Sequence, residues 1–523
     1  MKYYPDFFND VFGPVMQPGS SSHTAAPCRL GLMARSFLGE EPKTARFILD
    51  REGSFAGTFG LMNEDKGMLA GVMGFAPDDE RIYDVFDLAG QSGLVYEFIF
   101  DQMKESDHLN SLKIVLRGES GRTISLVGDS TGGGMVRVRK LDGIPVDFIG
   151  DTYVLLFFAA DAGFSVAVED VEGFVEQNSY SHGDARLLYV KSSQRPDIDA
   201  VRRRYPGLRV ALLEPILPVI IRRERRPQLF TTVGQWVAQA HAQGVDVGEI
   251  AIQYEMDSSL WPRQRVVDTM RDIRDVLIRQ IHTPYEQEIT DRNPFYRYDG
   301  DKWTAYQRGG KVLSGPLMGE VIRRAIGVNS KVKGTPIVPG PMGTGGGYLF
   351  SALYSVKEAY GYSDEELLRG LFVAAGIGAL AYSHTDPTGE VIGCAGECGV
   401  CCAMGAAAIV AMAGAGERIE AAASLALQGF IGLPCDPIVG GFEAPCYSRV
   451  ITAASMAVVY ADLALAGVPA VLPFEEVLRA ADAVGRALPP QLLCTGSGGC
   501  CDTPTGRKCE SAYRQWAKNQ GRH

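Results

Sequence analysis

The chain is poor in histidine and carries more acidic than basic residues. Only seven of its 523 residues are histidine, and only His23 and His384 lie in suggestive polar settings. A lone histidine in a polar loop is usually a hydrogen-bonding residue, so the residues alone do not predict that either is catalytic. The net charge of −11 argues against a nucleic acid as partner, because phosphate binding needs clustered Lys and Arg.

Long hydrophobic runs and an apolar leader are also missing. The uncharged run 399–416 consists mostly of Ala, Gly and Cys, whose transfer into lipid gains little free energy. We therefore expect a tightly packed buried helix there and no membrane partner. The start Met-Lys-Tyr-Tyr-Pro-Asp lacks the apolar core of a signal peptide, which predicts a cytoplasmic protein. In that compartment cysteines stay reduced and available to metal.

The length and the pattern predict an α+β multidomain protein. A chain of 523 residues should hold two or three domains. Residues 1–150 alternate short β-rich runs with Gly-rich turns and predict an α/β domain. Residues 151–226 follow a βαββαβ-like rhythm that ends in a basic linker at 222–226. Residues 227–523 turn helical. The segments predicted in most detail are strands at 112–116, 123–127, 135–139, 153–159, 185–190 and 208–213, and helices at 197–205, 450–465 and 474–488.

Cysteine is almost absent before position 394 and crowded after it. Ten of the eleven cysteines lie at or after that position, a pattern typical of thiolate metal ligation, which we interpret as an iron-sulfur site. Two ligand sets compete. Cys394, Cys398 and Cys401 form the C-x3-C-x2-C spacing that a radical enzyme would use to hold a cluster. That motif is expected early in a barrel, with most of the catalytic domain after it, whereas here only about a quarter of the chain follows.

The second ligand set takes Cys394 together with Cys435 and Cys446. Cys435 opens a Pro/Gly-rich loop and Cys446 closes it, so the backbone can wrap a cluster. Three thiolates would leave one iron without a protein ligand. An open iron is a Lewis acid that can turn a substrate hydroxyl into a leaving group.

Several other residues are candidates for the site. Ser20, Ser21, Ser22, His23 and Thr24 precede a predicted helix, where hydroxyls and backbone amides can hold a carboxylate; the alternative is a polar helix cap. Glu397 and Asp436 lie beside predicted ligands and could orient them or move protons. The Gly-rich loop 340–347 either faces the site or is a turn between helices. The remaining thiols either cap the cluster or form a separate redox or metal site: Cys494, Cys500, Cys501 and Cys509.

Three motifs in order carry a resemblance to a known family. They are Ser20-Ser-Ser-His23-Thr24, Gly393-Cys394-x-Gly-Glu397, and Cys435-Asp-Pro-x-x-Gly-Gly continuing to Pro-Cys446. Together they resemble the iron-sulfur-dependent L-serine dehydratases (L-serine ammonia-lyases), with the family's β and α parts fused in one chain.

The resemblance implies a fold, a cofactor and a reaction. It implies an ACT-like module within 151–226, and an all-helical C-terminal domain that carries a [4Fe-4S] cluster on Cys394, Cys435 and Cys446. The Ser20–Thr24 loop would hold the carboxylate of L-serine while a base takes the α-proton and water leaves. The products would be pyruvate and ammonia, without pyridoxal phosphate. A homo-oligomer, in particular a dimer, and a small amino-acid substrate are the expected partners.

One departure from the family pattern leaves the substrate open. Where the family usually carries a Gly-His-x-Thr-Asp segment, the spacing places Met62 at the histidine position. Two alternatives to L-serine dehydration therefore stand: a carbon-sulfur lyase of the cysteine desulfidase type, and a catalytically silent, cluster-bearing amino-acid sensor.

Overall fold

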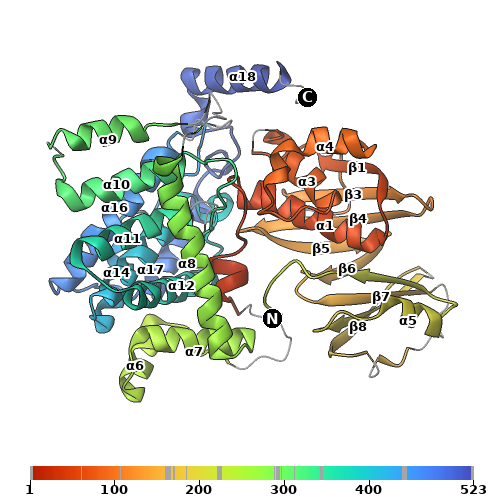
Figure 1. The fold of residues 1–523 in the computed structure, drawn as a ribbon, viewed down its shortest axis with the longest axis horizontal. Helices are drawn as coiled ribbons and strands as arrows, with labels where there is room; N and C mark the ends of the chain where they lie inside the picture. The colour runs from red at the N-terminus through yellow and green to blue at the C-terminus, as the bar shows by residue number, and fades with distance from the viewer. Residues whose placement is uncertain are drawn as a thin grey trace. The chain divides into compact units, whose positions relative to one another are not determined.

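The computed structural model divides the chain into two compact units, each treated by itself. One unit combines Met1–Gly19 with Arg225–His523, and the other spans Ser20–Glu224 (Figure 1). The structure describes residues 4–60, 62–106, 108–159, 166–168, 171–183, 185–220, 227–287, 289, 295, 297–310, 312–341, 345–438 and 444–519. The predicted linker 222–226 and parts of the two Gly-rich loops, 342–344 and 439–443, lie outside these ranges.

The Ser20–Glu224 unit begins with a six-stranded sheet of order β2-β1-β3-β4-β5-β6, in which only β1 and β2 pair in parallel. Along its central strands, buried side chains alternate with more exposed ones. In β3, Leu112, Ile114 and Leu116 are buried and face the core. The predicted strands 112–116, 123–127 and 135–139 are confirmed. The six strands are β1 (Pro42–Asp50), β2 (Val95–Asp101), β3 (Ser111–Gly118), β4 (Thr123–Gly132), β5 (Met135–Leu141) and β6 (Ile144–Phe148).

Helices pack on this sheet through small residues. The longest, α1 (Ala26–Leu38), contacts β3, β4 and β5 and runs beside α3 (Glu64–Val72) (Figure 1). A Cβ on Gly71 would lie 2.0 Å from the Cys28 carbonyl oxygen, and one on Gly31 would lie 2.8 Å from the Val72 nitrogen. The two helices therefore touch at their backbones. The other helices here are η2 (Ser21–Ala25), α2 (Ser54–Gly57), η3 (Glu80–Asp84) and α4 (Val85–Ser92).

Replacing Gly71 by alanine should separate these two helices. We expect Gly71→Ala to lower the free energy of unfolding by about 1–3 kcal/mol, because the added methyl overpacks a backbone contact. Gly90→Ala in α4 is the matched control, since a Cβ there meets nothing within 4 Å; it should stabilise the helix by up to about 1 kcal/mol. Urea unfolding followed by circular dichroism checks both, and equal midpoints for Gly71→Ala and the wild type would contradict the close approach.

The same unit ends in a four-stranded antiparallel sheet of order β10-β7-β9-β8. The predicted strands 153–159, 185–190 and 208–213 and the helix at 197–205 are confirmed. A further strand occupies 174–182, so the described elements follow the order βββαβ. The first helix of the predicted βαββαβ-like rhythm would fall between 159 and 174, where residues 160–165 and 169–170 lie outside the described ranges. The elements are β7 (Tyr153–Ala159), β8 (Phe174–His182), β9 (Ala185–Ser192), α5 (Ile198–Arg204) and β10 (Arg209–Leu213). Leu156, Tyr189 and Leu213 share one hydrophobic core with the larger sheet. The ACT-like identity of this module stays a prediction.

The second unit is helical, as predicted for 227–523. Its centre is α14 (Val400–Met412), every residue of which is buried among α11, α12, α15 and α16. Gly405 lets α16 approach, since a Cβ there would lie 3.0 Å from the Ala457 Cβ. The other α-helices are α6 (Val233–Gln243), α7 (Val247–Ser259), α8 (Arg263–Glu286), α9 (Gly300–Arg308), α10 (Gly315–Asn329), α11 (Gly345–Tyr360), α12 (Asp364–His384), α13 (Gly389–Ile392), α15 (Ile419–Gln428), α16 (Cys446–Leu465), α17 (Phe474–Ala487) and α18 (Pro504–Asn519). Short helices are η1 (Phe7–Val11), η5 (Ala395–Gly399), η6 (Gly416–Arg418), η7 (Pro490–Leu492) and η8 (Gly499–Asp502).

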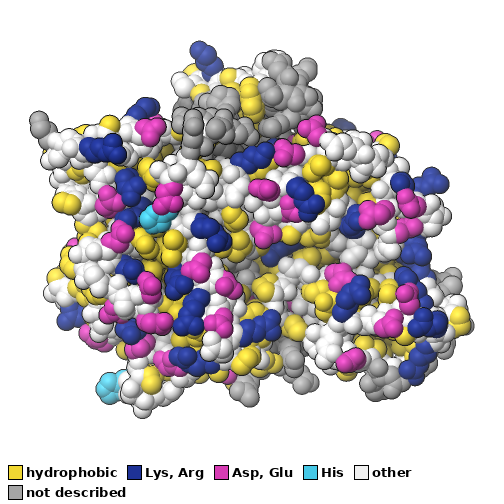
Figure 2. Space-filling model, in the orientation of Figure 1, with side chains coloured by type: hydrophobic (Ala, Val, Ile, Leu, Met, Phe, Trp, Pro, Cys, Tyr) yellow, Lys and Arg dark blue, Asp and Glu magenta, His cyan; other side chains and the backbone are white. Residues whose placement is uncertain are grey.

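Three helical stretches are long and apolar enough to cross a membrane, judged by length and composition: Asp364–His384, Ala395–Met412 and Cys446–Leu465. The most apolar windows of the first two are 78% and 94% buried inside the protein, whereas that of the third is 39% buried. The run predicted to be a buried helix is therefore buried. Figure 2 shows basic and acidic side chains interspersed on the face that it displays.

The first residues of the chain depart from the predicted boundaries. The prediction placed 1–150 in one domain, but residues 1–19 belong to the helical unit. The reason is an aromatic contact: Phe7 stacks on Tyr254 with 5.4 Å between ring centroids, and the Phe7 N–H donates to Glu255 Oε2 at 2.7 Å. Met16 also pairs its backbone with Ile337.

Candidate functional site

The first cysteine stretch bends sharply between α13 and α14. Gly393 has φ of +66°, and a Cβ there would lie 2.3 Å from the Leu433 carbonyl oxygen, so glycine is required. The same carbonyl accepts the Cys394 N–H at 2.9 Å. The π-helix η5 (Ala395–Gly399) then carries Cys398 into α14. This geometry buries Cys394 at the turn.

The second cysteine stretch is held by the C-terminal segment. The Cys435 N–H donates to the Leu492 carbonyl at 2.8 Å, and the Cys494 N–H donates to the Cys435 carbonyl at 2.7 Å. This parallel pairing brings the Cys494 thiol into hydrogen-bonding contact with the Cys435 thiol. The sequence left the place of Cys494 open. Cys446 begins α16.

The thiols interact in pairs. Cys394 Sγ and Cys398 Sγ lie 3.3 Å apart. The hydrogen bond with Cys398, together with the Arg449 guanidinium, holds the pKa of the Cys394 thiol below its usual value against the effect of burial. The hydrogen bond with Cys494, together with burial, raises the pKa of Cys435 well above its usual value. Of the predicted set, Cys394 is therefore the thiol whose pKa is lowered.

Within the described ranges, no three His, Cys, Asp or Glu side chains are arranged to hold a metal ion. The donor set nevertheless fits an iron-sulfur cluster in kind, because soft thiolates select such clusters. The absence of a side chain at Gly389 leaves room for the Cys435 sulfur. A Cβ on Gly389 would lie 2.7 Å from Cys435 Sγ and 3.3 Å from Glu397 Cδ. The ligand set Cys394, Cys435 and Cys446 stays a prediction.

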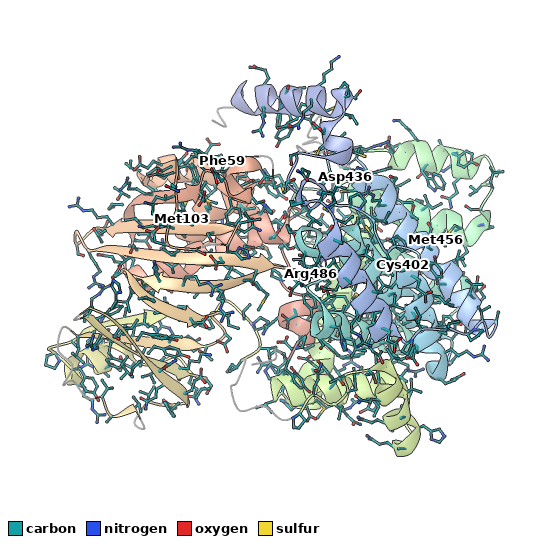
Figure 3. All side chains as sticks on the ribbon, turned by 180° about the vertical axis from the view of Figure 1, so that it is seen from behind. Phe59, Met103, Cys402, Asp436, Met456 and Arg486 are labelled. Carbon is teal, nitrogen blue, oxygen red and sulfur yellow. The ribbon has the colours of Figure 1, made fainter. Side chains whose placement is uncertain are left out.

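Two acidic residues lie beside these thiols, as predicted. Glu397 is half-buried, and desolvation raises its pKa well above the usual value, with the Cys394 charge adding to the effect. A neutral Glu397 can donate a proton. Asp436 is 3% exposed and pairs with Arg449 at 2.8 Å, beside the segment that leads into α18 (Figure 3). Arg449 was not predicted from the sequence, although its position three residues after Cys446 places it on the same side of the helix.

The Ser20–Thr24 segment lies in the other unit, where the polar-cap alternative is confirmed. Ser20 Oγ accepts the His23 N–H at 3.2 Å at the start of η2. The His23 ring lies between two hydroxyls, with Nδ1 2.9 Å from Ser22 Oγ and Nε2 3.0 Å from Ser54 Oγ. Ser54 was missed because only the fold brings it to His23. A cap and a carboxylate site are compatible, since both use hydroxyls and backbone N–H groups at a helix start.

A buried carboxyl, that of Glu64, is hydrogen-bonded to Met62, which in turn contacts the Ser20–Thr24 segment. Glu64 is fully buried, and burial together with Asp65 raises its pKa well above the usual value. Its Oε2 accepts the Met62 N–H at 3.0 Å, while the Met62 carbonyl accepts the Thr24 hydroxyl at 2.6 Å. Met62, at the family's histidine position, therefore holds Thr24 through its backbone.

The proton on Glu64 can be assigned from its partners. The Thr58 hydroxyl lies 2.9 Å from the Ser54 carbonyl oxygen and 2.7 Å from Glu64 Oε1. The Thr58 hydroxyl has one proton for these two acceptors, so a neutral Glu64, which can itself donate to Thr58, would satisfy both contacts.

Glu64→Gln should preserve both hydrogen bonds and remove the ionisation. Because the folded pKa of Glu64 is raised, wild-type stability is complete below the unfolded glutamate pKa of about 4.3 and falls as the pH rises toward the folded pKa. The loss is up to about 1.4 kcal/mol per pH unit. We expect the variant to gain stability over the wild type between pH 5 and pH 8, measured by urea midpoints. The exposed Glu80→Gln is the control, and parallel curves for Glu64→Gln and the wild type would contradict the assignment.

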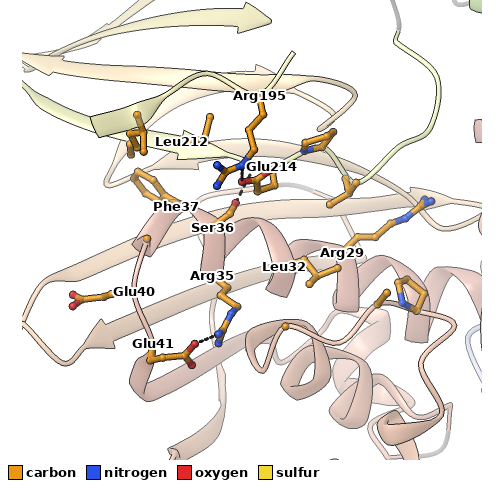
Figure 4. A pocket seen from close by; sticks show the side chains of 18 of the residues that line it. Arg29, Leu32, Arg35, Ser36, Phe37, Glu40, Glu41, Arg195, Leu212 and Glu214 are labelled. Carbon is orange, nitrogen blue, oxygen red and sulfur yellow. Dashed lines mark hydrogen bonds and ion pairs between the residues drawn. The ribbon is translucent and has the colours of Figure 1, made fainter. Parts of the chain in front are cut away.

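A separate pocket of about 790 Å³ lies in the Ser20–Glu224 unit between α1 and the small module (Figure 4). Its guanidinium groups are already engaged: Arg35 pairs with Glu41, and Arg195 Nε lies 2.9 Å from Glu214 Oε1. None of the predicted site residues lines it. Four arginines and three glutamates line it, so the pocket carries little net charge to select a ligand of one sign.

Comparison with known proteins shows what the chain is similar to. The profile of the family described as Serine dehydratase alpha chain matches residues 242–501, which include Cys394, Cys435 and Cys446. The probable L-serine dehydratase alpha chain of Bacillus subtilis is 32% identical over 285 residues, which cover 54% of this chain and 94% of that protein. The alpha chain of Peptoniphilus asaccharolyticus is 29% identical over 287 residues, 54% of this chain and 97% of that protein. The L-serine dehydratase beta chain of Peptoniphilus asaccharolyticus is 37% identical over 147 residues, 28% of this chain and 65% of that protein.

Proposed function

The chain belongs to the L-serine dehydratase family, with alpha-type and beta-type parts fused in one polypeptide, and we propose that it eliminates water from L-serine to give pyruvate and ammonia. The observation that carries the proposal is the buried thiol group around Arg449, inside the stretch that the family profile matches. The earlier resemblance to this family is thereby confirmed.

The proposal includes a [4Fe-4S] cluster held by Cys394, Cys435 and Cys446. When bound, such a cluster with three protein thiolates supplies an open iron that acts as a Lewis acid toward the β-hydroxyl. The cysteines are buried or half-buried, which would exclude bulk water from the metal. Glu397 and Cys435 both border Gly389, and Glu397 in its neutral form would be the proton donor to the departing hydroxyl.

The proposal assigns substrate binding to the Ser20–Thr24 segment. Its hydroxyls, together with the Ser54-bonded His23 ring, would orient the carboxylate of L-serine. Glu64 and Met62 would keep Thr24 in place without touching the substrate. We further propose a cytoplasmic homodimer with no nucleic acid or membrane partner.

An anaerobic assay on a panel of amino acids tests the function. Protein reconstituted with iron and sulfide should turn L-serine into pyruvate and ammonia without pyridoxal phosphate, with products identified by mass. Sulfide released from L-cysteine with higher efficiency would favour the carbon-sulfur lyase. Ligand-dependent changes in oligomeric state with no turnover would favour the sensor, and full activity of metal-free protein would exclude the cluster mechanism.

A further inference from the structure

We propose that Arg449 is a positioning residue that ties together the three chain segments predicted to hold the cluster. The inference rests on the proposed function, because it concerns the same thiol group. Arg449 lies in the first turn of α16, three residues after Cys446. Its side chain therefore leaves the helix on the side of that cysteine.

The Arg449 guanidinium reaches both other segments. Its Nη1 donates to the Pro434 carbonyl at 2.7 Å and to Asp436 Oδ1 at 2.8 Å, the two residues that flank Cys435. It also lies near enough to the Cys394 thiol for its positive charge to lower the pKa of that thiol. One side chain thus links three segments that together span about fifty residues of the sequence.

The carboxylate that pairs with Arg449, that of Asp436, is held in place by its surroundings. The Asp436 side chain is 4% exposed and that of Arg449 is 17% exposed, so the pair is largely removed from water. Asp436 Oδ2 accepts the Cys500 N–H at 2.7 Å. Gly499, with φ of +68°, closes over it, since a Cβ there would lie 2.3 Å from Asp436 Oδ2. The C-terminal segment therefore fixes Asp436, and Asp436 fixes Arg449.

The chemistry of this position requires arginine in particular. A planar guanidinium offers five N–H donors in a fixed fork, whereas a lysine ammonium is a point charge on a flexible stem. Nη1 alone donates to two acceptors, the Pro434 carbonyl and Asp436 Oδ1, and the fork has further N–H groups for other acceptors. A hydrogen bond to a ligating sulfur also tunes the reduction potential of a cluster. Arg449 should therefore affect both the retention and the potential of the cluster.

The test compares Arg449→Met and Arg449→Lys with the wild type in full-length protein reconstituted anaerobically. Groups that orient metal ligands typically contribute about 10–100-fold to metal affinity or activity. We expect Arg449→Met to lose its iron to a chelator at least about tenfold faster, with a more negative cluster potential and an altered electron paramagnetic resonance spectrum. Arg449→Lys should retain the fold and recover only part of the loss. Arg479→Met, which removes an exposed arginine of α17, is the matched control and should behave like the wild type.

The outcomes separate this inference from the proposed function. If wild-type protein binds the cluster and turns over L-serine while both Arg449 variants match it in iron retention, potential and spectrum, the inference is wrong and the function stands. If wild-type protein binds no cluster, the function itself fails. Should Arg449→Met not fold, as judged by circular dichroism, Arg449→Lys decides, because wild-type retention and spectrum in that variant would overturn the role of the fork.

Discussion

Cys435→Ser is expected to yield a protein that no longer retains a complete [4Fe-4S] cluster and has almost no dehydratase activity. Lewis-acid assistance by a metal is worth several kcal/mol of transition-state stabilisation, and each 1.36 kcal/mol is tenfold in rate, so kcat/KM should fall by about 1,000-fold or more. The measurements are iron and sulfide per chain, absorbance near the cluster band, and pyruvate formation under anaerobic conditions.

Cys401→Ser is the matched control, because both residues are buried free cysteines of the same unit. The Cys401 thiol lies in α14, 3.4 Å from the Gly345 carbonyl oxygen, and burial raises its pKa to about 12. A neutral thiol hydrogen-bonded inside a helix bundle is a structural residue, so this variant should retain its cluster. If Cys401→Ser loses the cluster while Cys435→Ser retains it, the C-x3-C-x2-C set is the ligand set and the proposed one is wrong.

Local patterns predicted most elements of this fold. The alternation of Leu112, Ile114 and Leu116 identified β3, and the 3.6-residue spacing of Phe474, Val477 and Leu478 identified α17, because each pattern depends on neighbours within one element. The burial of α14 also followed from its composition. Strand β8 was not predicted, because its residues are mostly polar and half-exposed and give no clear alternation.

Long-range partners could not be predicted in this way. The pairing of Cys494 with Cys435 depends on backbone hydrogen bonds between segments about sixty residues apart, which no local period records. The contact of Ser54 with His23 has the same origin. The predicted site residues were therefore found as separate motifs, whereas the groups that position them, Arg449, Gly389 and Ser54, emerged only from the fold.

Phe7→Ala is expected to destabilise the helical unit although Phe7 precedes the α/β unit in sequence. The ring is fully buried, 5.4 Å from the Tyr254 ring and 6.5 Å from the Phe372 ring by their centroids. Removing a buried phenylalanine leaves a cavity and costs about 3–5 kcal/mol. Hydrogen exchange should therefore show faster exchange in α7 and α12, which carry these two partners.

The location of the effect decides whether residues 1–19 belong to the helical unit in solution. Phe174→Ala in β8 is the matched control, because Phe174 is 41% exposed. Its substitution should lower the free energy of unfolding by much less than Phe7→Ala does. If Phe7→Ala instead loosens β1 to β6 and leaves α7 and α12 protected, the N-terminal segment packs as the sequence first indicated. Slower exchange is not expected anywhere, since the cavity removes contacts and adds none.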